Sequence, residues 1–257
     1  MTAQLRASTL PQRTAWALAA GLCVAAAAAL AQPTASAPGA ASQASGPTGP
    51  VPNTLAQRVL ACTGCHGASG RAAPDGYYPR LAGKPAGYLY NQLLNFRDGR
   101  RDYGLMSDLV TPLSDAYLRD IAGHFASLDL PYPAPQAPTV PAEALQRGQR
   151  LVLQGDAQRG LPACTACHGT RLTGTQPAVP GLLGLSRDYL NGQLGAWRGG
   201  QRHAQAPDCM ADIARRLSTD DIHVITQFLS AQVMPADTHP AAALPGPAPM
   251  RCGGLAP

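Results

Sequence analysis

The chain has few of the residues on which enzyme active sites usually depend. Only 14% of its 257 residues are charged and 5% are aromatic, and Lys84 is the only lysine. There is no convincing acid–base pair, no nucleophile with a partner base and no phosphate-binding loop, which argues against catalysis by such groups. Strand-rich stretches are also missing, and no basic run suggests nucleic-acid binding.

Four of the seven cysteines form two copies of one motif. Cys62-Thr63-Gly64-Cys65-His66 recurs as Cys164-Thr165-Ala166-Cys167-His168. Cys-x-x-Cys-His is the attachment signal for c-type haem, in which the thiols form thioethers with the vinyl groups and the histidine ligates iron. The sequence therefore predicts two covalently attached haem c groups. The attachment residues are Cys62, Cys65, Cys164 and Cys167, and the first iron ligands are His66 and His168.

Two other kinds of site use Cys-x-x-Cys pairs. A thioredoxin-like dithiol needs a surrounding βαβ pattern, which neither copy has. A zinc site built from both pairs uses four thiolates and leaves the histidine after each pair unexplained. Haem is the preferred interpretation, and zinc binding and dithiol chemistry are the alternatives.

The N-terminal residues have the features of an export signal. Arg6 and Arg13 precede an apolar run over 15–30, which ends in the cleavage-site pattern Ala29-Leu30-Ala31. We therefore predict a signal peptide over 1–31 and a periplasmic protein. An uncleaved membrane anchor is the alternative, although the run is short and rich in alanine for a span of about 20 apolar residues.

The charge balance is mild. The chain has 20 basic and 15 acidic residues, and cleavage of the signal leaves 18 basic residues. The propionates of two haems bring the total near neutrality, so no nucleic-acid partner is expected.

Proline-rich segments divide the chain, and the parts between them are duplicated. Seven residues recur at one offset: Tyr88, Leu89, Gln92, Leu93, Arg97, Gly99 and Arg101 match Tyr189, Leu190, Gln193, Leu194, Arg198, Gly200 and Arg202. The predicted organisation is a signal (1–31), a disordered linker (32–52), a first domain (53–131), a Pro-rich linker (132–141), a second domain (142–235) and a Pro-rich tail (236–257).

The apolar pattern predicts an all-α fold of short helices around each haem. Leu89, Leu93 and Phe96 share one helical face, as do Leu190, Leu194 and Trp197. Opening helices are expected over 54–61 and 142–154. Closing helices are expected after the N-caps Ser114 and Ser218, the second of which begins a sequence that resembles a capping box.

Each iron needs a sixth ligand or an open site. Met106 and Met210 follow the duplicated helices at matching places, and we predict that both are thioether ligands. The competing residues, which lack counterparts in the other half, are His124, His203, His223 and His239. A backbone carbonyl near Pro79 and another near Pro180 are expected to accept a hydrogen bond from the second ring nitrogen of each motif histidine.

With these motifs, Pro79-Arg80-Leu81-Ala82-Gly83, the segment 88–101 and the paired methionines, the chain resembles the class I cytochromes c. It is most similar to the dihaem cytochrome c-four type of bacterial periplasms. The resemblance covers residues 53–234. It implies two cytochrome folds with neighbouring haem propionate edges, His/Met ligation at both irons and service as a soluble electron shuttle. Arg97 and Arg198 are candidates for contact with the propionates.

Two cysteines lie outside the motifs. In an oxidising compartment we expect Cys209 and Cys252 to form a disulfide that holds the tail against the Met210 side of the second haem. Two free thiols are the first alternative. A Cys209 thiolate as iron ligand, as in thiosulfate dehydrogenases, is the second.

The predicted function is single-electron transfer between redox proteins, not catalysis. The expected partners are a terminal oxidase, a quinol–cytochrome c reductase or a periplasmic dehydrogenase. A role as the cytochrome subunit of such a dehydrogenase is an alternative to that of a free carrier. The membrane is a partner only if the signal segment is uncleaved. The alternatives are a haem enzyme such as a thiosulfate dehydrogenase or a dihaem peroxidase.

Overall fold

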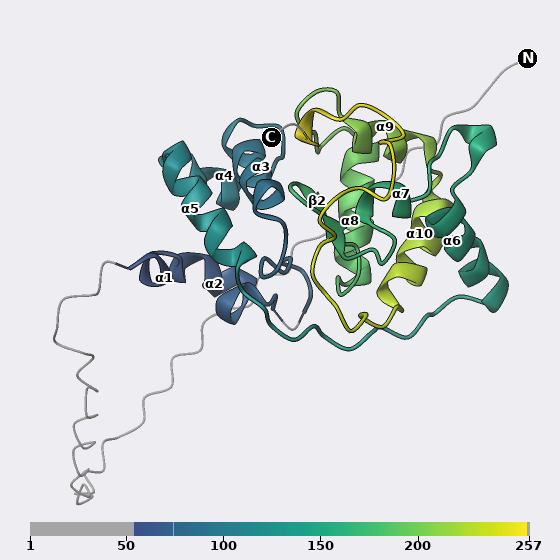
Figure 1. Ribbon diagram of the computed structural model, residues 1–257, viewed down its shortest axis with the longest axis horizontal. Helices are drawn as coiled ribbons and strands as arrows, with labels where there is room; N and C mark the ends of the chain where they lie inside the picture. Colours follow the sequence, from purple (N-terminus) through teal and green to yellow (C-terminus); the bar gives the residue numbers. More distant parts are fainter. Residues whose placement is uncertain (1–53, 74, 256–257) are drawn as a thin grey trace, which may run out of the picture. The chain divides into compact units, whose positions relative to one another are not determined.

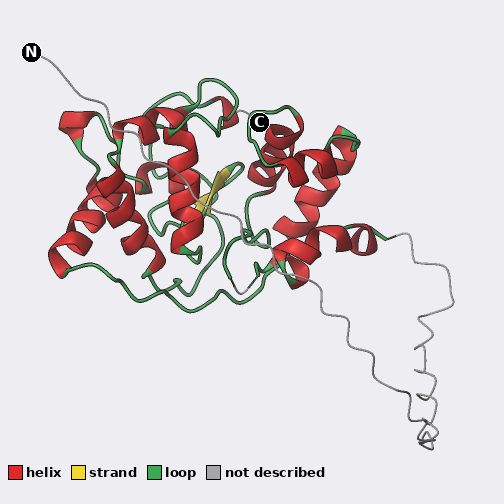
Figure 2. Cartoon of the chain, turned by 180° about the vertical axis from the view of Figure 1, so that it is seen from behind, coloured by secondary structure: helices red, strands yellow, loops and turns green. Residues whose placement is uncertain are grey.

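The computed structural model describes residues 54–73 and 75–255, and the regular secondary structure in this part of the chain is nearly all helical, with long loops between the helices (Figure 1). Ten α-helices and one two-stranded sheet lie in the described residues. Figure 2 shows the helices in red and the strands in yellow. The all-α prediction is confirmed. The predicted signal peptide (1–31) and linker (32–52) lie outside the described residues.

The first half contains α1 (Leu55–Arg58), α2 (Leu60–His66), η1 (Ala68–Gly70), α3 (Ala86–Arg97), α4 (Gly104–Val110) and α5 (Asp115–Ala126). The second half contains α6 (Ala142–Gln154), η2 (Ala157–Arg159), α7 (Thr165–His168), β1 (Gly174–Thr175), β2 (Val179–Pro180), α8 (Arg187–Arg198), α9 (Cys209–Arg216) and α10 (Thr219–Ser230), and η3 (Gly253–Leu255) lies in the tail. No helix of the described part is long and apolar enough to cross a membrane.

Each half has its own hydrophobic core. In the first half α3 packs against α5, and Leu118 and Phe125 of α5 are almost completely buried. In the second half α10 packs against both α6 and α8. Gly148 of α6 lies so close to the backbone of Val224 that a Cβ would not fit, so glycine is required where these two helices cross.

The closing helices begin at the predicted caps. The Ser114 side chain accepts a hydrogen bond from the Tyr117 backbone N–H, which satisfies a free donor at the start of α5. At α10 the capping box is complete: Ser218 Oγ accepts from the Asp221 N–H and the Asp221 carboxylate accepts from the Ser218 N–H. The local cap signals therefore place both helix starts correctly.

The elements differ from the sequence expectations in three places. The opening helix of the first half is divided at Val59 into α1 and α2, whereas α6 has the expected bounds. The segments that carry the two methionines form the short helices α4 and α9, where no helix was expected, because seven or eight residues are too few to show a clear apolar period. A small hairpin, β1–β2, follows the second motif.

The Pro-rich connector between the halves is extended and held by contacts with both. The Arg80 guanidinium donates to the carbonyls of Leu130 and Pro131 and stacks 3.8 Å from the Tyr132 ring. Further along, the Gln136 N–H donates to the Ser230 carbonyl over 2.8 Å. The two cores support the predicted division into two domains, whose boundaries stay a prediction.

The tail also packs against the second half. The Ala241 N–H donates to the Gly174 carbonyl and its own carbonyl accepts from the Gln176 N–H, which adds a short bridge beside β1. Further on, the tail is joined to α9 by the Cys209–Cys252 disulfide.

Candidate functional site

The first motif lies at the end of α2, where its histidine points into the protein. His66 is only 6% exposed, and its Nδ1 lies 2.8 Å from the Pro79 carbonyl oxygen. A carbonyl can only accept, so Nδ1 carries the proton and donates, which leaves Nε2 with a free lone pair for a metal ion.

The second motif has the same geometry on α7. His168 is 7% exposed, and its Nδ1 donates to the Pro180 carbonyl over 2.7 Å. The predicted carbonyl contacts are therefore confirmed in both halves. Such contacts fix the orientation of a metal-bound imidazole and make it more basic.

The protonation of these groups suits metal ligation. Burial lowers the pKa of His66 and of His168, and the hydrogen bonds to the proline carbonyls oppose this effect only partly. Both imidazoles are neutral at pH 7, the form that binds iron. Burial raises the pKa of the Cys164 thiol to about 12, the opposite of the low pKa that a dithiol redox centre requires.

A large cavity lies next to His66. Its volume is about 630 Å³, and Cys62, His66 and Met106 line it together. The predicted apolar face of α3, formed by Leu89, Leu93 and Phe96, also lines it. Cys65 is exposed and lies outside the lining.

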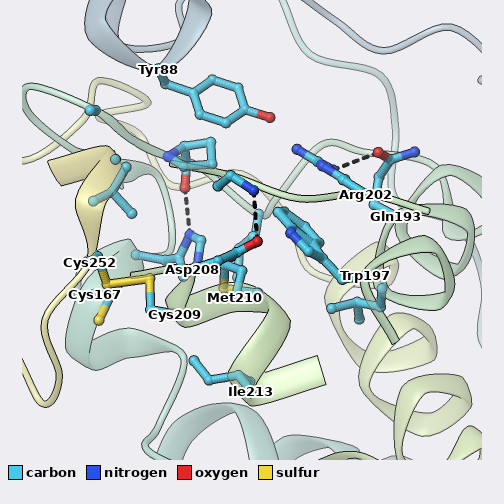
Figure 3. Close-up of a pocket in the computed structure, with 18 of the residues that line it drawn as sticks. Tyr88, Cys167, Gln193, Trp197, Arg202, Asp208, Cys209, Met210, Ile213 and Cys252 are labelled. Carbon is cyan, nitrogen blue, oxygen red and sulfur yellow. Dashed lines mark hydrogen bonds between the residues drawn. A yellow bond between two sulfur atoms is a disulfide. The ribbon is translucent and has the colours of Figure 1, made fainter. Parts of the chain in front are cut away.

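The cavity next to His168 has the same elements with a smaller volume of about 200 Å³. Cys164, Cys167, His168 and Met210 line it together with Leu190, Leu194 and Trp197 of α8. Residues of the tail also contribute to this cavity but not to the first: Met250, Cys252, Gly254 and Leu255. Figure 3 shows Met210, Trp197 and the disulfide around it.

The disulfide between Cys209 and Cys252 confirms the predicted pairing, with a Cα–Cα distance of 5.2 Å. Its presence argues against a Cys209 thiolate as an iron ligand, because that sulfur is already bonded. None of the four competing histidines lines either cavity. His223 and His239 are exposed, and the latter hydrogen-bonds Asp237.

Two buried cations and one half-buried cation line the cavities. Lys84 and Arg202 are 9% and 3% exposed and line both cavities, and Arg101 lines the first. Burial lowers the pKa of Lys84 to about 8. Within the described residues none of the three forms an ion pair. Such a cluster is costly to bury without anions.

The two arginines and two glutamines join the halves symmetrically. Arg101 donates to Gln92 over 3.0 Å and to Gln193 over 2.7 Å, and Arg202 donates to Gln92 over 2.8 Å and to Gln193 over 2.5 Å. The backbones of Arg101 and Arg202 also form a β-bridge. We call these four side chains the Arg–Gln quartet.

These residues fit haem, which combines an apolar plate with two carboxylates. The apolar walls match the plate, and the cations Lys84, Arg101 and Arg202 match the carboxylates. The buried Trp197 Nε1, which has no hydrogen-bond partner in the described residues, is a further donor beside the second cavity. Zinc and dithiol chemistry leave the cavities and the cations unexplained.

Arg97 and Arg198, which the sequence offered either as contacts for propionates or as ordinary surface arginines, lie outside both cavities. Arg97 forms ion pairs with Asp98 and Asp115, and Arg198 donates to the Leu217 carbonyl; neither lines a cavity. Arg101 was visible as another of the repeated residues, together with its partner in the second half. Its location between the cavities depends on how the halves pack, which the repeat does not reveal.

The comparisons with known proteins agree with this geometry. No family model matches the chain. A thiosulfate dehydrogenase electron acceptor from Thiomonas intermedia (strain K12) is 38% identical over 174 residues, which cover 68% of this chain and 79% of that protein. Cytochrome c4 from Pseudomonas aeruginosa is 36% identical over 67% of this chain and 84% of its own length. The crystal structure of reduced recombinant cytochrome c4 from Pseudomonas stutzeri matches with a TM-score of 0.60 and 29% identity, covering 69% of this chain and 96% of that chain.

Fold and site together define a c-type cytochrome with two class I cytochrome c domains. The family carries haem c and transfers electrons. The chain belongs to the cytochrome c4 family, and it is an electron carrier, not an enzyme in itself.

Proposed function

We propose that the chain is a periplasmic carrier that holds two haem c groups and passes single electrons from a dehydrogenase to a further redox partner. In this proposal residues 1–31 direct export, and the domains over 53–131 and 142–235 each hold one haem. The thioether bonds are to Cys62, Cys65, Cys164 and Cys167, and the iron ligands are His66 with Met106 and His168 with Met210.

The observation that carries the proposal is the pairing of histidine and methionine in each cavity. His66 shares a cavity with Met106, and His168 shares one with Met210. A histidine–methionine pair fills both axial positions of an iron and raises its reduction potential relative to two histidines. Six-coordinate iron leaves no position for a substrate, which suits a carrier and disfavours a peroxidase.

When bound, haem supplies an iron that gains or loses one electron. The residues of the chain provide the rest. Pro79 and Pro180 hold the proton of each proximal imidazole on Nδ1, and the apolar walls exclude water. Lys84, Arg101 and Arg202 supply positive charge near both cavities, where they are expected to neutralise propionates.

A dehydrogenase is the favoured donor because of the names of two relatives. The proteins from Thiomonas intermedia and from Stutzerimonas stutzeri are called thiosulfate dehydrogenase electron acceptors. We infer that this chain accepts electrons from an enzyme of the same kind. Mixing the oxidised protein with thiosulfate and a thiosulfate dehydrogenase tests this: the haems should become reduced, and should stay oxidised if either component is omitted.

The ligands are tested by the visible spectrum of the oxidised protein. The far-red band of methionine-ligated ferric haem should have the intensity of two haems. Met106→Ala and Met210→Ala should each remove half, and the potential of that haem should fall by on the order of 0.1 V, since axial ligands set haem potentials over about 0.8 V. Met250→Ala is the matched control, because Met250 lines the second cavity and is not a proposed ligand. If the band of the wild type has the intensity of a single haem, the assignment of both methionines as ligands is wrong.

A further inference from the structure

The helices α4 and α9, which carry the two methionines, present corresponding faces to different surroundings. The methionine helices α4 and α9 correspond when they are aligned on their methionines. Leu105 then matches Cys209, Asp108 matches Asp212, and Leu109 matches Ile213. The second copy therefore shows what covers this face when it is not left bare.

In the second copy the tail and the core cover the face. Cys209 is bonded to Cys252 of the tail, and Ile213 is half-buried and packs against the core of the second half. The tail residues Met250 and Leu255 line the cavity on the same side.

In the first copy the same face is bare. Leu105 is 67% exposed and Leu109 is 40% exposed. Tyr77, which is 61% exposed, lines the first cavity together with Leu109, so the apolar surface continues to the edge of the haem cavity. In the second half the large exposed apolar residues are Leu153 and Val233, and neither lines a cavity.

The charges of the two faces differ as well. Asp212 on α9 forms ion pairs with Arg215 and Arg216 of the same helix. On the first copy Asp108 lies between the two exposed leucines in sequence, and Asp102 lines the cavity just before α4. Neither forms an ion pair within the described residues, so this face has two carboxylates without a cationic partner.

We propose that this α4 face (Asp102, Leu105, Asp108 and Leu109, with Tyr77 beside it) is the docking surface for a redox protein whose own contact surface has an apolar centre and an Arg- or Lys-rich rim. Transient interfaces combine an apolar core with a polar rim, and opposite charges steer the encounter. The proposal rests on the proposed function, because it names the place where a partner reaches the first haem.

The electron step at this face is simple. One electron leaves the ferrous centre of the partner and reduces the ferric iron of the first copy. The partner becomes ferric and the iron of the first copy becomes ferrous. No proton or chemical group moves between the proteins. The face therefore needs only to bring the partner close to the cavity edge.

The experiment measures bimolecular electron transfer by stopped flow, with a basic class I cytochrome c in its ferrous form as the probe. The Asp102→Asn/Asp108→Asn double variant should slow the reaction at least ~5-fold at low salt and flatten its dependence on ionic strength, because steering by charge changes on-rates by about 10-fold or more. Leu105→Ala should slow it severalfold at all salt concentrations. The matched controls are Asp220→Asn and Val233→Ala, which change exposed residues of the second half and should leave the rate unchanged.

Several outcomes overturn the proposal. If the α4 variants and the controls change the electron-transfer rate equally, the partner docks elsewhere. If the rate of the wild type rises with salt concentration, the face repels a basic partner. If the wild type sediments as a dimer and Leu105→Ala sediments as a monomer, the face binds a second copy of the chain. Slow labelling of a Leu105→Cys variant by a maleimide, in the isolated full chain, means that the chain covers its own face.

Failure of the proposed function gives a different result. Dithionite is small and needs no docking surface, so it should reduce both haems of the wild type and of every variant at the same rate. If the wild type lacks two methionine-ligated haems, or dithionite does not reduce them, the carrier function is wrong whatever the docking variants do.

Discussion

The two halves of the molecule have the same kinds of residues around their cavities and differ in what covers those cavities. Each has a motif histidine that donates to a proline carbonyl, a helix with an apolar face on the cavity and a methionine on a short helix. The first cavity measures about 630 Å³ and the second about 200 Å³, and only the second is lined by the tail. The comparison teaches that both copies keep a histidine and a methionine on one cavity, whereas the tail covers only the second cavity and the apolar side chains of α4 stay exposed in the first.

The largest difference between the copies is expected to come from the disulfide. Its cysteines are 43 residues apart, and closure of a loop of this length stabilises the folded state by roughly 4 kcal/mol in the chain-entropy account. Cys209→Ser/Cys252→Ser should therefore lower the free energy of unfolding of the second half by about that amount and affect the first half much less, since the tail is joined to it through the Asn91–Gly254 hydrogen bond.

The measurement can distinguish the halves. In the protein without the proposed signal peptide (1–31), which contains Trp16, Trp197 is the single tryptophan, so its fluorescence reports on the second half during denaturation. In a Met210→Ala background the far-red methionine band comes from the first haem alone, so its loss during denaturation reports on the first half. If the Trp197 signal of the double variant has the same denaturation midpoint as that of the wild type, the disulfide contributes nothing to stability.

The next difference between the halves is how their stability depends on acid pH. Burial alone raises the pKa of Asp221, but hydrogen bonds from Arg159, Ser218 and Arg147 lower it to about 2. Because the pKa in the folded state is below the unfolded value of about 3.9, this carboxylate stabilises the second half above pH 4. That contribution is lost as the pH falls from about 4 to about 2. The first half has Tyr117 at this place in its cap, so acid should weaken the second half selectively.

Asp221→Asn tests this prediction. The loss should be about 2 kcal/mol of unfolding free energy at pH 7, and the variant should lose the acid dependence between pH 4 and 2. Asp220→Asn, which changes the exposed neighbour, is the control and should behave as the wild type. An identical acid transition in Asp221→Asn and the wild type would mean that another group determines it.

The smallest effects are expected at the helix caps. Ser114→Ala removes one side-chain hydrogen bond at the start of α5 and should cost about 1 kcal/mol. Ser218→Ala should cost more, because it also breaks the reciprocal arrangement with Asp221. Thermal unfolding of both variants measures the difference, and equal shifts would argue that the complete capping box adds no stability.

Local signals in the sequence predicted the parts of the fold that depend on near neighbours. The cap at Ser218, the bounds of α6 and the carbonyl contacts of His66 and His168 follow from spacing within about fifteen residues. The disulfide was predictable because only two cysteines outside the signal segment remain after the motifs are assigned.

The features that escaped prediction depend on contacts between distant segments. The burial of Lys84 and the pairing of Arg101 with Gln193 arise only where the halves meet. The tail was expected to reach the second haem, but not the first half, where the Asn91 side chain donates to the Gly254 carbonyl over 3.0 Å. No local pattern of apolar or charged residues specifies such a contact. The helix α9 was missed because its eight residues are too few to show a clear apolar period, although Asp208 is a favourable N-cap that accepts from the Ala211 N–H.

The Arg–Gln quartet joins the two halves in a two-fold pattern. Each arginine donates to the glutamine of its own half and to that of the other half, so the same surface is used from both sides. This is the isologous pattern by which identical subunits associate in a two-fold dimer. Within one chain this interface forms without the entropy cost of bringing two separate molecules together. The two copies can therefore differ elsewhere while the quartet holds them together: the tail packs on the second, and the leucines of α4 stay exposed on the first.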